Sequence, residues 1–172
     1  MAKIFRRYRS EIHGNYRVAY LKYGLLTGVV MSLYLFLRHW IGHPLPTPSD
    51  LVKDFILIAA IVLFTYVYRK GLPDRRVTFK ELILMGMGIG LVAALVYGLA
   101  LWLYCGVAYP DMTEAYAAGF RTEESSSEGY LAALNPAMWA FFYGFLHTVV
   151  TSIIVAFFAA LVFRTEKGER VN

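Results

Sequence analysis

The fold of this chain is decided by the stretch LILMGMGIGLVAALVYGLALWLYCGV, which runs from Leu82 to Val107. It contains no Asp, Glu, Lys, Arg or His. A helix that rises about 1.5 Å per residue needs roughly 20 mostly apolar residues to cross the hydrocarbon of a bilayer. This stretch is long and apolar enough to do so, and we predict that it forms a transmembrane helix.

Three other stretches meet the same condition: Val18–Trp40, Leu51–Tyr68 and Pro136–Phe163. The 172 residues are 58% hydrophobic with a mean hydropathy of +0.50, which is more apolar surface than a soluble domain of this size can bury. We therefore predict a single all-α membrane domain over residues 1–172, a bundle of four transmembrane helices. Thr78 and Glu81 are spaced as a capping box at the start of the third span, and Asn135 before Pro136 suits the start of the fourth.

The basic residues predict the orientation. All but three of the 17 Lys and Arg residues lie near the amino terminus, between the second and third spans, or in the tail; the exceptions are Arg38, Lys53 and Arg121. Basic residues concentrate on the cytoplasmic side of membrane proteins, so both termini are expected there. Because these charges flank apolar runs, the net charge of +5 reflects membrane topology, and we expect no nucleic-acid partner. No small-x-small cleavage pattern follows Leu37, so the first span is expected to be retained.

The segment between the third and fourth spans, Ala108–Asn135, is the largest part expected outside the bilayer. Its first half, Pro110–Tyr116, predicts a short extracytoplasmic amphipathic helix. An acidic, serine-rich stretch follows at Glu123–Glu128. The segment suits either a loop that docks a partner or a solvated connector whose helix rests on the headgroups, and we favour the connector.

Small residues at a spacing of four mark three of the spans as packing faces. Membrane helices associate where small side chains let their backbones approach. We expect these faces to pack within the bundle, with a homodimer or a partner membrane protein as the alternative. The second span has no such ladder and is expected to have the most contact with membrane lipid of the four spans. The ladders are Gly24, Gly28 and Ser32, then Gly86, Gly90, Ala94 and Gly98, and finally Gly144, Thr148, Ser152, Ala156 and Ala160.

His147 is the one ionisable residue that we place at membrane depth, where such residues are costly and are candidates for function. Thr151 lies one turn further along the same helix and offers a hydroxyl partner. A proton relay needs a second titratable group inside the membrane, and the sequence offers none at that depth. We therefore favour a neutral packing histidine. Near the outer ends of the first two spans, Arg38 and Asp54 are placed to form an ion pair.

No catalytic, metal or cofactor site emerges from the sequence. His39 and His43 are four residues apart, but Gly42 and Pro44 disfavour a continuous helix and no third ligand is evident. The run Gly86–Gly90 lies inside an apolar helix and is no dinucleotide-binding loop. Cys105 is the single cysteine, which excludes an intrachain disulfide.

The order and spacing of several short motifs give a family resemblance. The chain resembles, over about Val18 to Lys167, the bacterial membrane family catalogued as domain of unknown function 4199, typical of Bacteroidota. The resemblance implies a four-span inner-membrane protein with no assigned activity, and it provides no catalytic residues to carry over. The motifs are Tyr23–Gly28, Thr78–Glu81, Pro110-Asp111 ahead of Met112–Tyr116, Asn135-Pro136 and Arg164.

Abundant packing residues and scarce reactive ones point to a protein that binds rather than catalyses. The sequence favours a non-enzymatic accessory or scaffold subunit of a bacterial envelope assembly. The alternative is an oligomeric transporter or channel component, for which His147 is the polar candidate. An enzyme ranks third, because the only cluster of carboxylates, from Glu114 to Glu128, lies in a serine-rich setting that favours solvation.

Overall fold

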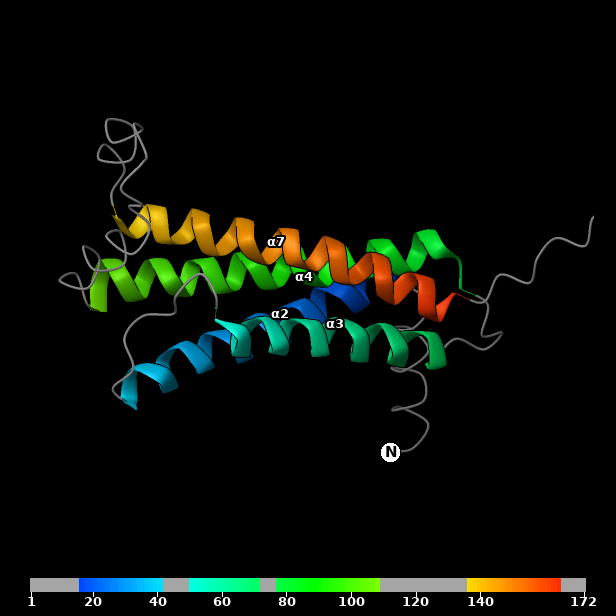
Figure 1. Cartoon of the computed structure of the whole chain (residues 1–172), viewed down its shortest axis with the longest axis horizontal. Coiled ribbons are helices and arrows are strands. Elements are labelled where there is room, and N and C mark those ends of the chain that lie inside the picture. The colour runs from blue at the N-terminus through cyan, green and yellow to red at the C-terminus, as the bar shows by residue number, and fades with distance from the viewer. Residues whose placement is uncertain (1–15, 42–49, 72–76, 109–135, 165–172) are drawn as a thin grey trace, which may run out of the picture.

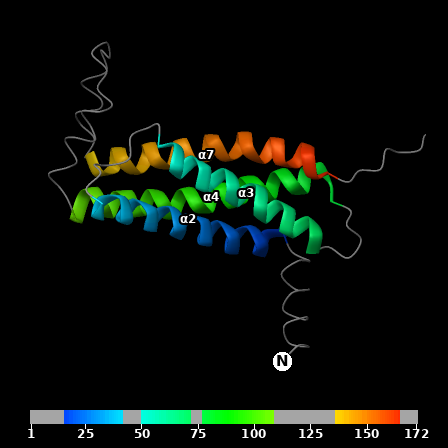
Figure 2. The same cartoon turned by 60° about the horizontal axis from the view of Figure 1, so that its bottom comes forward.

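A computed structural model describes residues 16–41, 50–71, 77–108 and 136–164 (Figure 1). These residues form four long helices and no strand, which confirms the predicted all-α fold. The helices run alternately up and down, with α4 and α7 side by side and α2 and α3 packed against them (Figures 1 and 2). They are α2 (Tyr16–Trp40), α3 (Leu51–Gly71), α4 (Phe79–Leu103), which continues into a π-helical turn η1 (Tyr104–Ala108), and α7 (Pro136–Phe163).

Each helix is long and apolar enough to cross a membrane, and the helix bounds lie close to the predicted spans. The predicted capping box at the start of α4 is confirmed. The backbone N–H of Glu81 donates to the Thr78 hydroxyl (3.3 Å), and the Thr78 N–H donates to the Glu81 carboxylate (3.0 Å). Asn135 and the amphipathic helix predicted at Pro110–Tyr116 lie outside the described residues, as does the acidic stretch Glu123–Glu128.

The two ends of the bundle differ in chemistry. At what we term the Trp40 end, α2 and η1 finish and α3 and α7 begin. Trp40 is the last residue of α2 and Trp102 lies in the last turn of α4, both near this end, as expected for an aromatic belt at a membrane surface. At the opposite end, termed the basic end, the described helices carry Arg17, Lys22, Arg69, Lys70, Lys80 and Arg164.

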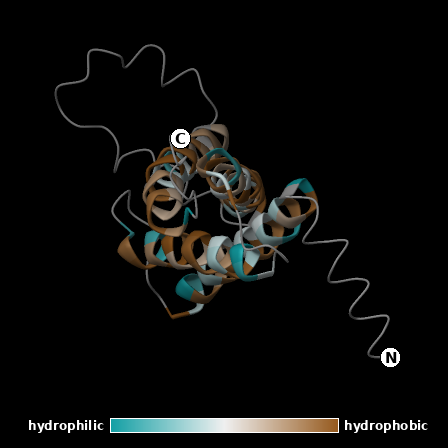
Figure 3. Ribbon diagram, turned by 90° about the vertical axis from the view of Figure 1, so that its right-hand side faces the viewer, coloured by the Kyte–Doolittle hydropathy of each residue, from teal (hydrophilic) through white to brown (hydrophobic). Residues whose placement is uncertain are grey.

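Helix α4 is the centre of the bundle. Half of the most apolar 18-residue segment of α4 is buried inside the protein, against 28% of the corresponding segment in each of the other three helices. Many large apolar side chains of the helices are exposed on the outside of the bundle, as a hydrocarbon surrounding requires. Figure 3 shows that hydrophobic residues predominate along the helices. The prediction that the second span has the most lipid contact is not supported, because the most apolar segment of α3 is buried to the same extent as those of α2 and α7.

Glycines bring α2 and α7 onto α4. A Cβ added at Gly24 would lie 2.6 Å from the Val92 side chain. On the other side of α4, a Cβ at Gly90 would lie 2.0 Å from the Ser152 hydroxyl, and one at Gly86 would lie 2.6 Å from Ala156. These distances are shorter than side chains tolerate, so the helices can approach this closely only where a side chain is absent.

Candidate functional site

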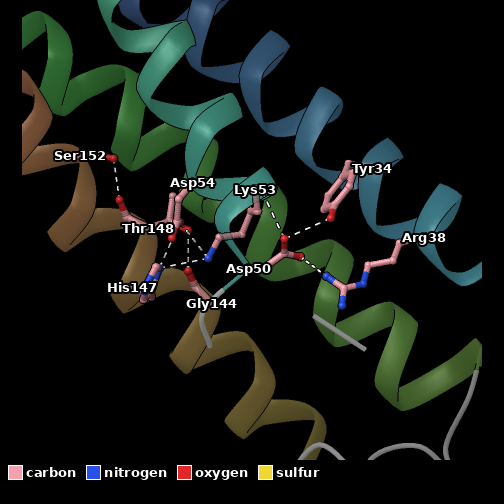
Figure 4. Close-up of polar contacts among 9 residues, drawn as sticks. All are labelled: Tyr34, Arg38, Asp50, Lys53, Asp54, Gly144, His147, Thr148 and Ser152. Carbon is pink, nitrogen blue, oxygen red and sulfur yellow. Dashed lines mark hydrogen bonds and ion pairs between the residues drawn. The ribbon is translucent and has the colours of Figure 1, made fainter. Parts of the chain in front are cut away.

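Polar side chains gather inside the bundle around the first turn of α3, close to the Trp40 end (Figure 4). They come from three helices, α2, α3 and α7. The first turn of α3 lies further from the Trp40 end than the last turn of α2 and the first turn of α7 do (Figure 1). It is therefore level with residues well inside these two helices. We call this cluster the polar seam; it consists of Tyr34, Arg38, Asp50, Lys53, Asp54 and His147.

The outer half of the polar seam is built on Asp50, the residue that precedes α3. The backbone carbonyl of Asp50 accepts a hydrogen bond from the backbone N–H of Asp54 (3.2 Å), and its Oδ1 accepts from the backbone N–H of Lys53 (3.5 Å). Asp50 therefore caps the helix. The other contacts of this carboxylate go to α2: Arg38 Nη1 donates to Oδ2 at 2.5 Å, and the Tyr34 hydroxyl donates to Oδ1 at 3.1 Å. One buried carboxylate therefore fixes the start of α3 against α2.

The inner half joins α3 to α7 through Lys53. Its ammonium nitrogen lies 3.0 Å from His147 Nδ1 and 3.3 Å from Asp54 Oδ1, while His147 Nδ1 is 3.6 Å from the same carboxylate oxygen. The Tyr97 ring of α4 lies below the ammonium, with its centroid at 5.8 Å. Among these neighbours Lys53 is buried, with 4% of the residue exposed.

The contact between Lys53 and His147 links their protonation states. When Lys53 is an ammonium group, which only donates hydrogen bonds, His147 Nδ1 accepts from it and a neutral ring carries its proton on Nε2. With a neutral His147, the positive charges of Arg38 and Lys53 balance the negative charges of Asp50 and Asp54. The polar seam is then electrically neutral, which lowers the cost of placing four charges within a membrane protein.

The inner half lies well inside the length of the bundle rather than at its end. Tyr97 precedes Trp102 by five residues, which places the Lys53 ammonium about 8 Å inside the level of Trp102 at 1.5 Å per residue. At that depth lipid provides no hydrogen-bond donors or acceptors. His147 is the twelfth of the 28 residues of α7, so it lies nearer to the middle of that helix than to its Trp40 end.

The polar seam is not fully enclosed by the chain. The side chain of His147 is 27% exposed and that of Asp54 is 20% exposed. Within the described residues, the contacts of the His147 ring are those to Lys53, Asp54 and the stacked ring of Tyr143, and none of the hydrogen bonds among them involves Nε2. These two side chains, one on α7 and one on α3, are therefore partly accessible to a group that approaches from outside the bundle.

Three sequence-based expectations for this region are wrong. Arg38 pairs with Asp50 rather than with Asp54, because Asp50 caps α3 on the side that faces α2. His147 bonds to Lys53 and not to Thr151. Titratable partners for His147 do exist in the chain, since the position of the first turn of α3 brings Lys53 and Asp54 beside it.

The sequence held a signal for these missed residues. Asp50, Lys53 and Asp54 are spaced by three and four, so they share one face of the first turn of α3. Tyr34 and Arg38 are likewise one turn apart on α2. The interpretation of Lys53 and Asp54 as charges at a helix end overlooked that both lie on the side of the helix that turns inward.

The small residues singled out in the sequence lie at contacts within the chain. Gly28 meets Val96, Gly98 meets Phe141, and Gly144 meets Leu101, while Ala94 and Ala156 are fully buried. The hydroxyls of the ladders donate back to their own helices one turn earlier: Ser32 to the Gly28 carbonyl, Thr148 to the Gly144 carbonyl and Ser152 to the Thr148 carbonyl.

His39, weighed as a metal ligand, instead meets the Tyr104 hydroxyl, with 2.6 Å between that oxygen and His39 Nδ1. His43 lies outside the described residues. No group of three or more His, Cys, Asp or Glu side chains suited to a metal ion occurs in the described part of the chain. Cys105 is buried.

The sequence matches the family described as protein of unknown function (DUF4199) over residues 22–165. That range includes all four helices except the first residues of α2. No curated protein and no solved structure matches the chain.

Proposed function

This chain belongs to the DUF4199 family of proteins of unknown function, and we propose, from its own residues, that it is a non-enzymatic accessory or scaffold subunit of a bacterial envelope assembly. It binds another membrane protein, and the contact surface is the polar seam between α3 and α7. The partner contributes a transmembrane helix whose polar side chain meets His147 and Asp54.

The observation that carries this proposal is the exposure of ionisable side chains at membrane depth. Ionisable residues in transmembrane helices almost always face a bundle interior, a water-filled cavity or a partner. His147 and Asp54 are partly exposed between helices whose neighbouring outward residues are apolar, including Ile58 and Ile154. Hydrocarbon cannot satisfy the Nε2 proton, whereas a polar side chain on a neighbouring helix can, with a gain of about 0.6–2 kcal/mol per hydrogen bond.

A transporter or channel component is the second candidate, favoured by the meeting of Lys53, Asp54 and His147 inside the membrane. These groups can exchange protons, as a relay requires. The interface between α4 and α7 is closed by contacts such as Gly90 with Ser152, so a conduction pathway would have to run along the polar seam, between this chain and another. Proton flux into vesicles that hold the chain and its partner, abolished by His147→Leu, would favour transport over an accessory role.

We also propose that the protein resides in the bacterial inner membrane with both termini in the cytoplasm. The support is the concentration of Lys and Arg at the basic end, where α2 begins and α7 finishes. A fluorescent protein that matures only in the cytoplasm, fused after residue 172, is expected to fluoresce; alkaline phosphatase fused there and active would reverse the orientation.

Two adjacent isoleucines of α7 test the partner surface. Ile154 follows His147 by seven residues, two turns along the same face, and is 54% exposed. Ile153 is 44% exposed but lies on the other flank of α7, among residues of α2 and α4. A photo-crosslinking amino acid placed at 154 in the full-length chain, in its native membrane, is expected to give a discrete adduct with another protein, whereas the same residue at 153 is not.

The variant His147→Leu provides the control for specificity. It removes the exposed donor but keeps a helix-forming apolar residue, so the bundle is expected to accumulate normally while the adduct at 154 falls at least five-fold. Equal adducts at 153 and 154, or an adduct unchanged by His147→Leu, would show that the polar seam is not the contact surface. An adduct with twice the mass of this chain would indicate self-association and overturn the accessory role.

A further inference from the structure

The opposite flank of α7 borders a groove that the proposed function does not use. The groove is a cavity of about 330 Å³ bounded by α2, α4 and α7 and open to the outside. Its walls are apolar, with Leu84, Met87 and Leu91 from α4 and Val149 and Ile153 from α7. Its charged lining residue is Arg17.

Gly88 and Tyr20 shape the floor of this groove. A Cβ at Gly88 would lie 2.6 Å from Cγ of the Tyr20 ring, so the ring rests directly on the backbone of α4. From Leu84 to Leu91 the lining extends seven residues along α4, about 10 Å at 1.5 Å per residue. The groove is therefore short compared with a transmembrane helix and offers a helix little surface to pack along.

The charged and apolar residues of the groove follow the same order as the headgroup and acyl chains of a phospholipid. Arg17 lies in the first turn of α2, at the basic end, and Tyr20 follows it by one turn. The apolar walls continue from there towards the middle of the membrane. A guanidinium has five donors and binds phosphate oxygens in a two-pronged geometry, so Arg17 can hold a phosphate in addition to its contacts within the chain. The other basic residues at this end add a positive potential that favours an anionic headgroup.

We propose that this groove is a binding site for a diacyl glycerophospholipid, with the phosphate on Arg17 and one acyl chain lying in the groove against the residues of α4 and α7 that line it. Such a lipid remains bound longer than the lipids that merely surround the protein, because its headgroup and one chain are both held. The site is independent of the polar seam, from which it is separated by the width of α7.

Mass spectrometry of the intact full-length protein tests the proposal. The protein is transferred from nanodiscs that contain phosphatidylglycerol, and the lipid-bound fraction is measured. Leu91→Trp fills the groove and is expected to lower that fraction at least five-fold. Leu99→Trp is the matched control, because Leu99 lies two turns further along α4, is similarly exposed (53% against 48%) and is not part of the lining. Equal retention in the two variants would overturn the site.

The role of Arg17 has its own measurement. Arg17→Gln is expected to lower phosphatidylglycerol retention at least three-fold, and Lys22→Gln, an exposed basic residue outside the lining, is expected to leave it unchanged. Diacylglycerol with the same acyl chains lacks the phosphate and is expected to be retained at least three-fold less by the unaltered protein. If diacylglycerol is retained equally, or if both basic variants behave alike, the phosphate contact is disproved.

Discussion

Two faces of α7 that are only a quarter-turn apart pack in opposite ways. The face towards α4 carries Gly144, Thr148 and Ser152, is buried, and contains no ionisable group. The face towards α3 carries His147, which meets Lys53 and Asp54 and remains partly exposed. On the first face the hydroxyls are satisfied by their own helix, whereas on the second the polar groups depend on other helices.

This difference separates the face of α7 that stabilises the bundle from the face that is available to bind another molecule. Close packing of small residues requires no removal of charges from water, so nearly all of its contact energy stabilises the bundle. A buried ion pair recovers little more than the cost of its own desolvation. The α4–α7 interface is therefore expected to dominate stability, and the polar seam is expected to contribute less to stability and more to binding.

The largest effect is expected from closing the space at Gly90. In Gly90→Ala the new Cβ would lie 2.0 Å from Oγ and 2.1 Å from Cβ of Ser152, both close to the backbone of α7. The helices must separate, and we expect a loss of about 4 kcal/mol or more, beyond the usual range for over-packing. The free energy of unfolding in mixed micelles of increasing dodecyl sulfate content measures it.

A second substitution shows whether the effect comes from this contact. Ser152→Gly removes the two clashing atoms, and the Cα of residue 152 lies 3.5 Å from the new Cβ, an ordinary contact distance. The double variant Gly90→Ala/Ser152→Gly should therefore recover most of the stability. If it is no more stable than Gly90→Ala alone, the helices are not held together by this approach.

A smaller loss is expected in the polar seam, at Asp50. Asp50→Ala removes both the cap of α3 and the acceptor for Arg38 and Tyr34. We expect a loss of about 2–3 kcal/mol, the range for hydrogen bonds to a charged group, in the same unfolding measurement. Asp50→Asn keeps a capping oxygen and is expected to lose less. The double variant Asp50→Ala/Arg38→Met should recover part of the loss, since Arg38 is no longer left as an unpaired charge. If Asp50→Ala lost more stability than Gly90→Ala, the comparison between the two faces would be reversed.

The helices and the capping box were predictable because their causes are local. A continuous apolar run such as Leu82–Val107 predicts a span from its own composition, and the contact between Thr78 and Glu81 depends on residues three apart. The close approaches at glycines follow the same logic, because a spacing of four marks one side of a helix. None of these predictions requires knowledge of where another helix lies.

The polar seam was not predictable in the same way, because it depends on the offset of one helix relative to the others. Lys53 sits in the first turn of α3, and such a residue is ordinarily taken as interfacial. Its burial beside His147, 94 residues away in the sequence, follows from α3 beginning level with the interior of α7. No pattern within residues 51–71 specifies that offset, so the partner of Arg38 and the neighbours of His147 could not be inferred.

The smallest effect is expected at Thr78, which lies in neither face and sets the scale for both. Thr78→Ala removes the acceptor for the Glu81 N–H at an exposed helix start, and loss of such a cap costs about 1 kcal/mol. Since Asp50 also caps a helix, the difference between Asp50→Ala and Thr78→Ala estimates what the contacts to Arg38 and Tyr34 add. A difference near zero in the unfolding measurement would mean that α2 gains no stability from the polar seam. The charges of the seam would then stabilise the bundle no more than a cap does, which would leave binding as their remaining use.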